Sequence, residues 1–148
     1  MSNTITLHRV LKAPVSRVFR AFINADALAT WISPFGFIAK VHEFNAVVGG
    51  AHRMSFINFT NQQEHSFGGT YYEIKPNELL RYGDKFDDPN LPGEMMVTIT
   101  FKEVICGTEL NIKQEGVPSV IPSEMCYLGW QESLIKLAQL VEPEINQR

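Results

Sequence analysis

The sequence predicts an α+β domain in which a curved antiparallel sheet of about seven strands wraps around one long C-terminal helix, with two short helices after the first strand. Three observations carry this prediction: helical spacing of apolar residues near the N-terminus, six consecutive segments with strand-like alternation, and a long amphipathic stretch near the C-terminus. Consecutive strands with short turns form an antiparallel meander. The long helix must bury its apolar face, and the sheet is the available partner.

The N-terminal part combines one strand and two short helices. Alternating residues predict a strand over Thr4–Lys12. Pro14 suits the first position of a helix, because the amide hydrogen that it lacks has no partner there. A second helix is expected over Asp26–Trp31, with Asn24 or Asp26 as its cap. The first helix presents one apolar face, with i, i+3, i+4 and i+7 spacing, made of Val15, Val18, Phe19 and Phe22.

Alternation with a period of two replaces helical spacing in the middle of the chain. It predicts six strands, which are Phe37–Phe44, His52–Asn58, His65–Ile74, Leu79–Phe86, Met95–Val104 and Thr108–Glu115. The connections are Gly49-Gly50, Asn61–Gln63, Pro76-Asn77, the loop Asp87–Gly93 and a tight hairpin turn at Cys106-Gly107. Gly68-Gly69 lies inside a predicted strand and indicates a bulge or a close approach of another backbone.

A long helix is predicted from Ser123 to about Val141. Pro122 suits its first residue, and Pro143 ends it. At 1.5 Å per residue the helix is roughly 30 Å long, which is enough to cross the sheet. The apolar residues that recur at helical spacing are Tyr127, Trp130, Leu134, Leu137 and Val141.

The composition is that of one globular domain. The chain has 148 residues, of which 45% are hydrophobic and 20% are charged, and this predicts a single domain over residues 1–148. A formal net charge of −3 without a clustered basic face argues against nucleic acid as a partner. Cys106 and Cys126 form no CxxC motif, and no cofactor is expected.

The sequence also bears on localisation. The first residues lack the basic and apolar regions of a signal peptide, and no run of about 18 apolar residues predicts insertion into a membrane. We therefore expect a cytoplasmic protein with both thiols reduced.

An ordered set of short segments covers almost the whole chain. The segments are Ala13-Pro14-Val15-Ser16-Arg17-Val18-Phe19, Trp31, Val48-Gly49-Gly50, Gly69-Thr70-Tyr71-Tyr72-Glu73-Ile74, Val97-Thr98-Ile99-Thr100-Phe101, Gly107-Thr108-Glu109-Leu110, and Gly129-Trp130-Gln131-Glu132-Ser133-Leu134 with Leu137. Together they resemble the START-like (SRPBCC) superfamily, in particular the subfamily related to the C-terminal domain of the activator of the heat-shock protein ninety ATPase. The resemblance implies a helix-grip fold, which agrees with the predicted order of elements.

The resemblance implies several kinds of function. Members of this superfamily bind lipids, sterols, hormones and polyketides, and some cyclise or hydrate them. The eukaryotic co-chaperone carries a separate N-terminal domain that helps to engage the chaperone, and 148 residues leave no room for that domain. This difference puts direct activation of a chaperone in doubt.

A cavity is expected between the sheet and the long helix, where the sheet cannot close fully on the helix. A bulge at Gly68-Gly69 would shift the register and turn neighbouring side chains to the other face. The predicted lining is mainly apolar and aromatic with a few polar groups, as in small-molecule pockets. The inward-facing set is His52, Met54, Phe56, Asn58, His65, Phe67, Tyr71, Tyr82, Asp84, Val97, Ile99, Phe101, Leu110, Ile112 and Gln114.

The candidate ligand-binding residues come from this face, from the two ends of the cavity and from the long helix. Trp130 is either a core anchor or one wall of the pocket, and Gly129 before it indicates close packing in the helix interior. The loop Asp87–Gly93 is either a plain exposed loop or a lid. The candidate residues are Trp31, Phe35, His52, Met54, Phe56, Phe67, Tyr71, Tyr82, Phe101, Gln114, Met125, Tyr127 and Trp130.

The first functional hypothesis is binding of a small hydrophobic or amphipathic molecule without catalysis. The alternative is a polyketide cyclase or hydrolase-like enzyme that uses His52, Asp84 or Tyr82, for example with a His52–Asp84 acid–base pair. His52, His65 and Asp84 show no metal-binding spacing, so no metal is expected. The third hypothesis is a co-chaperone-like interaction module or a homodimer subunit, which would show a large exposed apolar patch.

Overall fold

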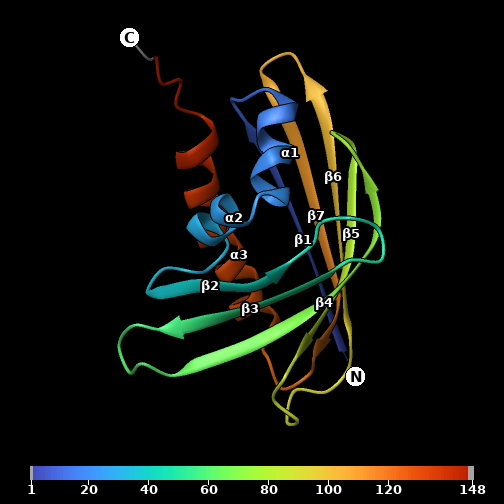
Figure 1. Cartoon of the computed structure of the whole chain (residues 1–148), viewed down its shortest axis with the longest axis vertical. Helices are drawn as coiled ribbons and strands as arrows, with labels where there is room; N and C mark the ends of the chain where they lie inside the picture. Colours follow the sequence, from blue (N-terminus) through green and yellow to red (C-terminus); the bar gives the residue numbers. More distant parts are fainter. Residues whose placement is uncertain (1, 147–148) are drawn as a thin grey trace.

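Seven antiparallel strands and three helices make up the computed structural model, which describes residues 2–146. The strand order is β1-β7-β6-β5-β4-β3-β2, so the sheet is a meander with β1 added beside β7. This architecture confirms the predicted fold class (Figure 1). The elements are β1 (Ser2–Leu11), α1 (Val15–Ile23), α2 (Ala25–Trp31), β2 (Phe37–Phe44), β3 (Ala51–Asn58), β4 (Glu64–Lys75), β5 (Leu79–Phe86), β6 (Met95–Val104), β7 (Gly107–Pro118) and α3 (Ser123–Val141).

The sheet bends strongly, and the helices lie on its concave side. In Figure 1, β1, β6 and β7 run along the long axis of the molecule, whereas β2, β3 and the start of β4 turn across it beneath α2 and α3. Residues on the concave face of the sheet therefore point toward the helices. No helix within residues 2–146 is long and apolar enough to cross a membrane.

The helix starts differ from the prediction by one residue. Pro14 and Pro122 are the caps before α1 and α3 rather than the first helical residues, because their ψ angles of 146° and 136° are extended. Asn24 is the cap of α2, where its side chain accepts a hydrogen bond of 2.9 Å from the amide of Ala27. Of the two caps proposed for α2, the structure selects the one that can reach an unpaired amide of the first turn.

At Gly68-Gly69 the backbone of β4 comes close to a neighbouring strand, and the strand does not bulge there. β3 pairs with β4 through both glycines without a shift of register. A Cβ on Gly69 would collide with the carbonyl group of Gly83 in β5, so only glycine fits there. The irregularity of β4 against β5 lies between Tyr71 and Glu73 instead. The alternation predicted for the inward face of β4 is therefore unbroken up to Tyr71.

The last hairpin also differs slightly from the prediction. Val104 pairs with Gly107, so the turn consists of Ile105 and Cys106 rather than Cys106-Gly107. β7 continues to Pro118, because Val117 still pairs with Asn3 of β1.

An aromatic cluster under α1 and α2 fills one part of the core. The ring of Phe22 lies with its centroid 4.7 Å from that of Trp31 and 5.2 Å from that of Phe101. The indole nitrogen Nε1 of Trp31 donates a hydrogen bond of 2.8 Å to the carbonyl oxygen of Ala21. Trp31 has no exposed surface, and Phe101 is 4% exposed. Both side chains are therefore buried in the hydrophobic core.

Candidate functional site

A cavity of about 510 Å³ lies between the concave face of the sheet and α3. Its walls come from the segment Leu28–Phe37, from β3 to β7 and from the first half of α3. Most of the lining is apolar, which is typical of small-molecule sites. The large apolar side chains of the wall include Phe37, Met54, Phe56, Phe67, Phe86, Met95, Ile121, Met125, Leu128 and Trp130.

The structure brings most of the predicted site residues together. Three of them do not line the cavity: Trp31 and Phe101 belong to the core cluster under α1, and Tyr127 is 37% exposed on α3. Sequence spacing cannot separate a core side chain from a cavity side chain on the same concave face. The predicted residues that do line the cavity are Phe35, His52, Met54, Phe56, Phe67, Tyr71, Tyr82, Asp84, Gln114, Met125 and Trp130.

Other lining residues were not singled out from the sequence. Leu80 and Phe86 share the inward face of β5 with Tyr82 and Asp84, so extending the same alternation would have found them. Phe37 and Met95 are the first residues of β2 and β6, and Met95 shares the inward face of β6 with Val97. The other lining residues lie on helix faces or in loops, where strand alternation gives no signal. They include Phe22, Leu28, Ile32, Pro34, Cys126, Leu128, Glu132 and Ser133.

Three rings form the polar end of the cavity. The ring centroid of His52 lies 5.3 Å from those of both Tyr71 and Tyr82, and the two tyrosine centroids are 5.7 Å apart. Tyr71 and Tyr82 are direct partners in the pairing of β4 with β5. Burial raises the pKa of both phenols above the ordinary value, so both hydroxyls keep their protons at neutral pH.

The hydrogen-bond partner of His52 determines which nitrogen of its ring carries the hydrogen. Its Nε2 lies 3.1 Å from the carbonyl oxygen of Gly83, which can only accept, so Nε2 carries the hydrogen. Burial lowers the pKa of His52 below the ordinary value, which keeps the ring neutral. Nδ1 is then a bare lone pair, and it has no hydrogen-bond partner among the described residues.

Asp84 lies on the same face of β5 as Tyr82, two residues further along. Burial raises the pKa of its carboxyl to about 8, against the smaller opposing effects of a backbone hydrogen bond at Lys85 and the charge of Arg53. Its Oδ1 is buried and has no partner within residues 2–146. The predicted His52–Asp84 pair is not hydrogen-bonded, because the histidine reaches over Gly69 to the carbonyl of Gly83 instead.

Gln114 connects the sheet to α3 across the cavity wall. Its Oε1 accepts hydrogen bonds from Nε1 of Trp130 at 2.8 Å and from the thiol of Cys126 at 3.4 Å. Its Nε2 donates to the sulfur of Met95 at 3.3 Å. Gln114 is therefore a positioning residue for α3, and Trp130 is both an anchor of the helix and a wall of the cavity.

The loop after α2 is fastened to α3 and forms one side of the cavity. Ser133 Oγ donates a hydrogen bond of 2.7 Å to the carbonyl oxygen of Ile32, and the Phe35 amide donates one of 3.2 Å to the carboxylate of Glu132. A Cβ on Gly129 would meet Pro34 at 3.5 Å, an ordinary contact rather than the close packing expected from the sequence.

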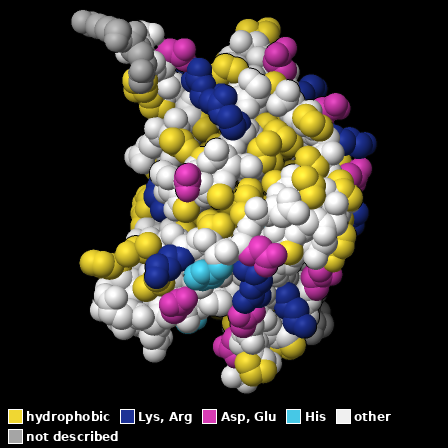
Figure 2. Space-filling view, in the orientation of Figure 1, with side chains coloured by type: hydrophobic (Ala, Val, Ile, Leu, Met, Phe, Trp, Pro, Cys, Tyr) yellow, Lys and Arg dark blue, Asp and Glu magenta, His cyan; other side chains and the backbone are white. Residues whose placement is uncertain are grey.

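Exposed apolar side chains surround the entrance. Phe35, Leu128 and Met125 line the cavity and are 50%, 53% and 65% exposed. Figure 2 shows hydrophobic side chains across the middle of one face of the molecule, with many of the charged side chains nearer its edges. An apolar ligand can therefore approach the cavity over an apolar surface.

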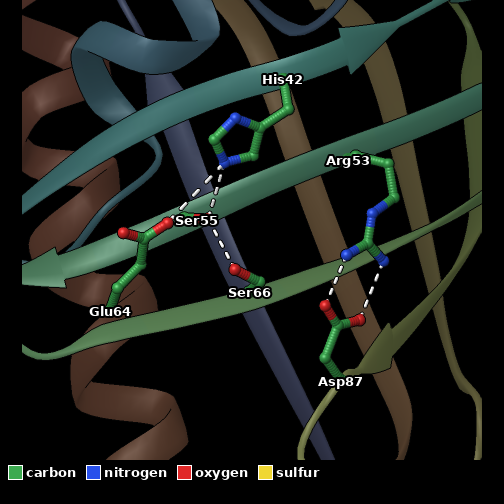
Figure 3. A network of polar contacts seen from close by, with 6 residues as sticks. All are labelled: His42, Arg53, Ser55, Glu64, Ser66 and Asp87. Carbon is green, nitrogen blue, oxygen red and sulfur yellow. Dashed lines mark hydrogen bonds and ion pairs between the residues drawn. The ribbon is translucent and has the colours of Figure 1, made fainter.

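The loop Asp87–Gly93 contributes no residue to the cavity lining, and it is an exposed loop rather than a lid. Asp87 is instead held by Arg53 of β3 on the outer face, with two N···O distances of 2.9 Å and 2.5 Å (Figure 3). This bidentate pair lowers the pKa of the Asp87 carboxyl.

A second polar cluster on the outer face has the residue types of a hydrolase triad. His42 Nε2 lies 2.7 Å from Ser55 Oγ and 3.9 Å from the carboxylate of Glu64, and Ser55 Oγ lies 2.7 Å from Ser66 Oγ (Figure 3). In a catalytic triad the acid holds the other ring nitrogen. Ser55 also has no exposed surface, so this cluster fastens β2, β3 and β4 together and offers no nucleophile.

No group of three or more His, Cys, Asp or Glu side chains in the described part of the chain is placed to hold a metal ion. Cys106 is exposed in the last hairpin turn, Cys126 is half-buried on α3, and both are free thiols.

Comparison with known proteins agrees with this architecture. The family model described as "Activator of Hsp90 ATPase homolog 1-like protein" matches residues 12–142. A search of the curated proteins found no match. A solved structure from Chromobacterium violaceum is 56% identical, with a TM-score of 0.95 and coverage of 96% of this chain and 99% of that one.

More distant structures share the fold at lower identity. The AHSA1 protein from Silicibacter pomeroyi is 20% identical, with a TM-score of 0.81 and coverage of 93% of this chain and 96% of that one. A protein from Rhodobacter sphaeroides is 18% identical, also with a TM-score of 0.81, and covers 93% of this chain and 91% of its own. The chain therefore belongs to the Activator of Hsp90 ATPase homolog 1-like family, within the START-like (SRPBCC) superfamily.

Proposed function

We infer that this protein binds a small hydrophobic or amphipathic molecule in the cavity between the sheet and α3. The observation that carries this proposal is the cavity itself, whose volume of about 510 Å³ falls within the range of small-molecule sites. Its walls are largely apolar, and a few polar side chains converge at one end. This division suits a ligand with an apolar body and a small polar group.

Packing arguments support the same conclusion. Protein interiors are close-packed, and voids larger than a water molecule are few. An apolar cavity of this size removes contacts that its lining side chains would otherwise make, which costs stability. A bound apolar molecule restores those contacts and offsets that cost.

The first test is native mass spectrometry of freshly purified protein beside its denatured mass, followed by titration with the uncharged fluorescent probe N-phenyl-1-naphthylamine. We expect a released small molecule, or saturable binding of the probe. A clean mass together with no saturable binding would refute the proposal.

A pair of variants at Gly129 localises the binding. Gly129 lines the cavity, its φ angle is ordinary for any residue, and a Cβ there makes only a van der Waals contact with Pro34. Gly129→Leu should narrow the cavity and weaken binding, whereas Gly129→Ala is the matched control and should retain it. Equal binding by both variants would place the ligand elsewhere.

A second candidate function is acid–base catalysis on the bound molecule. It is favoured by one specific observation, which is that the cavity lining holds both an unpartnered lone pair, His52 Nδ1, and the Asp84 carboxyl, whose pKa is raised to about 8. Turnover that His52→Ala abolishes while ligand binding persists would support this candidate.

A further inference from the structure

We propose that the polar end of the cavity, formed by Tyr71, Tyr82 and Asp84 beside His52, receives the carbonyl oxygen of an otherwise apolar and uncharged ligand. This inference rests on the proposed binding function and deepens it by naming the chemical class of the ligand.

The three proposed donors lie on one face of two paired strands. Tyr71 of β4 is the direct partner of Tyr82 of β5, and Asp84 follows Tyr82 by two residues, so its side chain leaves the same face. All three line the cavity. The arrangement therefore places three oxygen groups along one end of an otherwise apolar space.

One of these oxygens is buried without a partner in the protein. This oxygen is Asp84 Oδ1, whereas no hydrogen bond to either tyrosine hydroxyl is present within residues 2–146. Leaving buried polar groups unpaired costs free energy, which a ligand with a matching group recovers. Tyr72, the neighbour of Tyr71 on the opposite face, shows the contrast, since its hydroxyl donates to Glu94 at 2.6 Å.

Donors outnumber acceptors at this end of the cavity. Both phenols keep their protons, and a carboxyl with a pKa of about 8 is protonated in about nine molecules of ten at pH 7. Each of the three groups then offers an O–H. The single N–H group of the neutral His52 ring already donates a hydrogen bond to the carbonyl oxygen of Gly83. A carbonyl oxygen, which has two lone pairs and no hydrogen of its own, fits such a donor set.

The charges around the site disfavour a carboxylate as ligand. The nearby cation, Arg53, extends over the outer face and is paired with Asp87, so it does not neutralise a carboxylate in the cavity. Burying a carboxylate without a counterion is costly, whereas a ketone or ester carbonyl brings no charge.

The test uses 2-undecanone labelled with ¹³C at the carbonyl carbon and the unmodified protein at pH 7. Hydrogen bonding to a carbonyl oxygen moves its ¹³C resonance downfield, so we expect a downfield shift on binding. In competition against the fluorescent probe, the ketone should bind at least about tenfold more tightly than undecanoate, because that ion finds no cation in the cavity.

Variants then assign the donors. Tyr82→Phe removes one hydroxyl and keeps the ring, and it should weaken ketone binding about fivefold and reduce the downfield shift. Asp84→Leu should do the same through loss of the carboxyl proton. Tyr72→Phe is the matched control, because that hydroxyl lies outside the cavity, and it should leave both readouts unchanged.

The outcomes separate this inference from the function on which it rests. A ketone that binds without a downfield shift, or a shift that is unchanged in both Tyr82→Phe and Asp84→Leu, overturns the carbonyl site but not ligand binding. Tighter binding of undecanoate or 1-undecanol than of the ketone has the same meaning. If none of these probes binds, both proposals fail.

Discussion

Replacing Asp84 by Asn should change how the stability of the protein depends on pH. The carboxyl of Asp84 has a pKa of about 8 in the folded protein and an ordinary value of 3.8. Between these values the folded protein holds a proton that the unfolded chain has released. The stability that depends on this proton is therefore complete below about pH 4 and is lost progressively as the pH rises toward 8. Asn binds no proton in either state.

The magnitude follows from the width of that pH range. Each pH unit between the two pKa values lowers the free energy of unfolding by about 1.4 kcal/mol. From pH 5 to pH 7 the wild-type protein should therefore lose about 3 kcal/mol relative to Asp84→Asn. This interval lies inside the range set by the two pKa values, so it contains about half of the effect without reaching either end.

The assay is urea unfolding of both proteins at pH 5, 6 and 7, followed by far-ultraviolet circular dichroism. Other titrating groups are common to both proteins and cancel in the difference. Asp87→Asn is the control, because pairing with Arg53 lowers the pKa of Asp87 and confines its effect to acidic pH below about 4. A difference between wild type and Asp84→Asn that stays constant from pH 5 to pH 7 would refute the reasoning.

The other predictions concern packing around the cavity. Gly69→Ala should lower the free energy of unfolding by about 3 kcal/mol in urea, because its Cβ would collide with the carbonyl of Gly83, and wild-type stability would contradict that close approach. Gly129→Ala should instead raise it by about 0.5–1 kcal/mol, since the position is helical and has room for a Cβ; a lower thermal midpoint would count against this. Gln114→Leu should cost about 1–3 kcal/mol by leaving the indole N–H of Trp130 without its acceptor, and the emission spectrum of that tryptophan should change with it.

Local patterns in the sequence were sufficient to predict the helices and strands. They also predicted which side of the sheet the strand residues face. The change from 3.6-residue to two-residue periodicity separated helices from strands, and the unbroken alternation of β3 and β5 placed His52, Tyr82 and Asp84 on the concave face. These inferences succeed because side-chain direction in a strand is fixed by the backbone alone. The ordered motifs likewise identified the superfamily to which the chain belongs.

These local patterns could not predict contacts between segments that lie far apart in the sequence. Trp31 and Phe35 are four residues apart, yet the first is sealed in the core and the second lies at the entrance of the cavity. Trp130 donates a hydrogen bond to Gln114, and His52 donates one to Gly83. Each bond joins two segments that lie far apart in the chain, and nothing in the sequence shows that they are in contact.

The sequence by itself therefore determined the order of elements, the meander and the concave face, because these depend on backbone geometry and on the burial of apolar side chains. Only the tertiary structure decided which concave residues pack in the core and which line the cavity, since that depends on where α1, α2 and α3 rest on the curved sheet. The protonation of His52 and Asp84 was likewise decided by burial and by partners supplied from other strands.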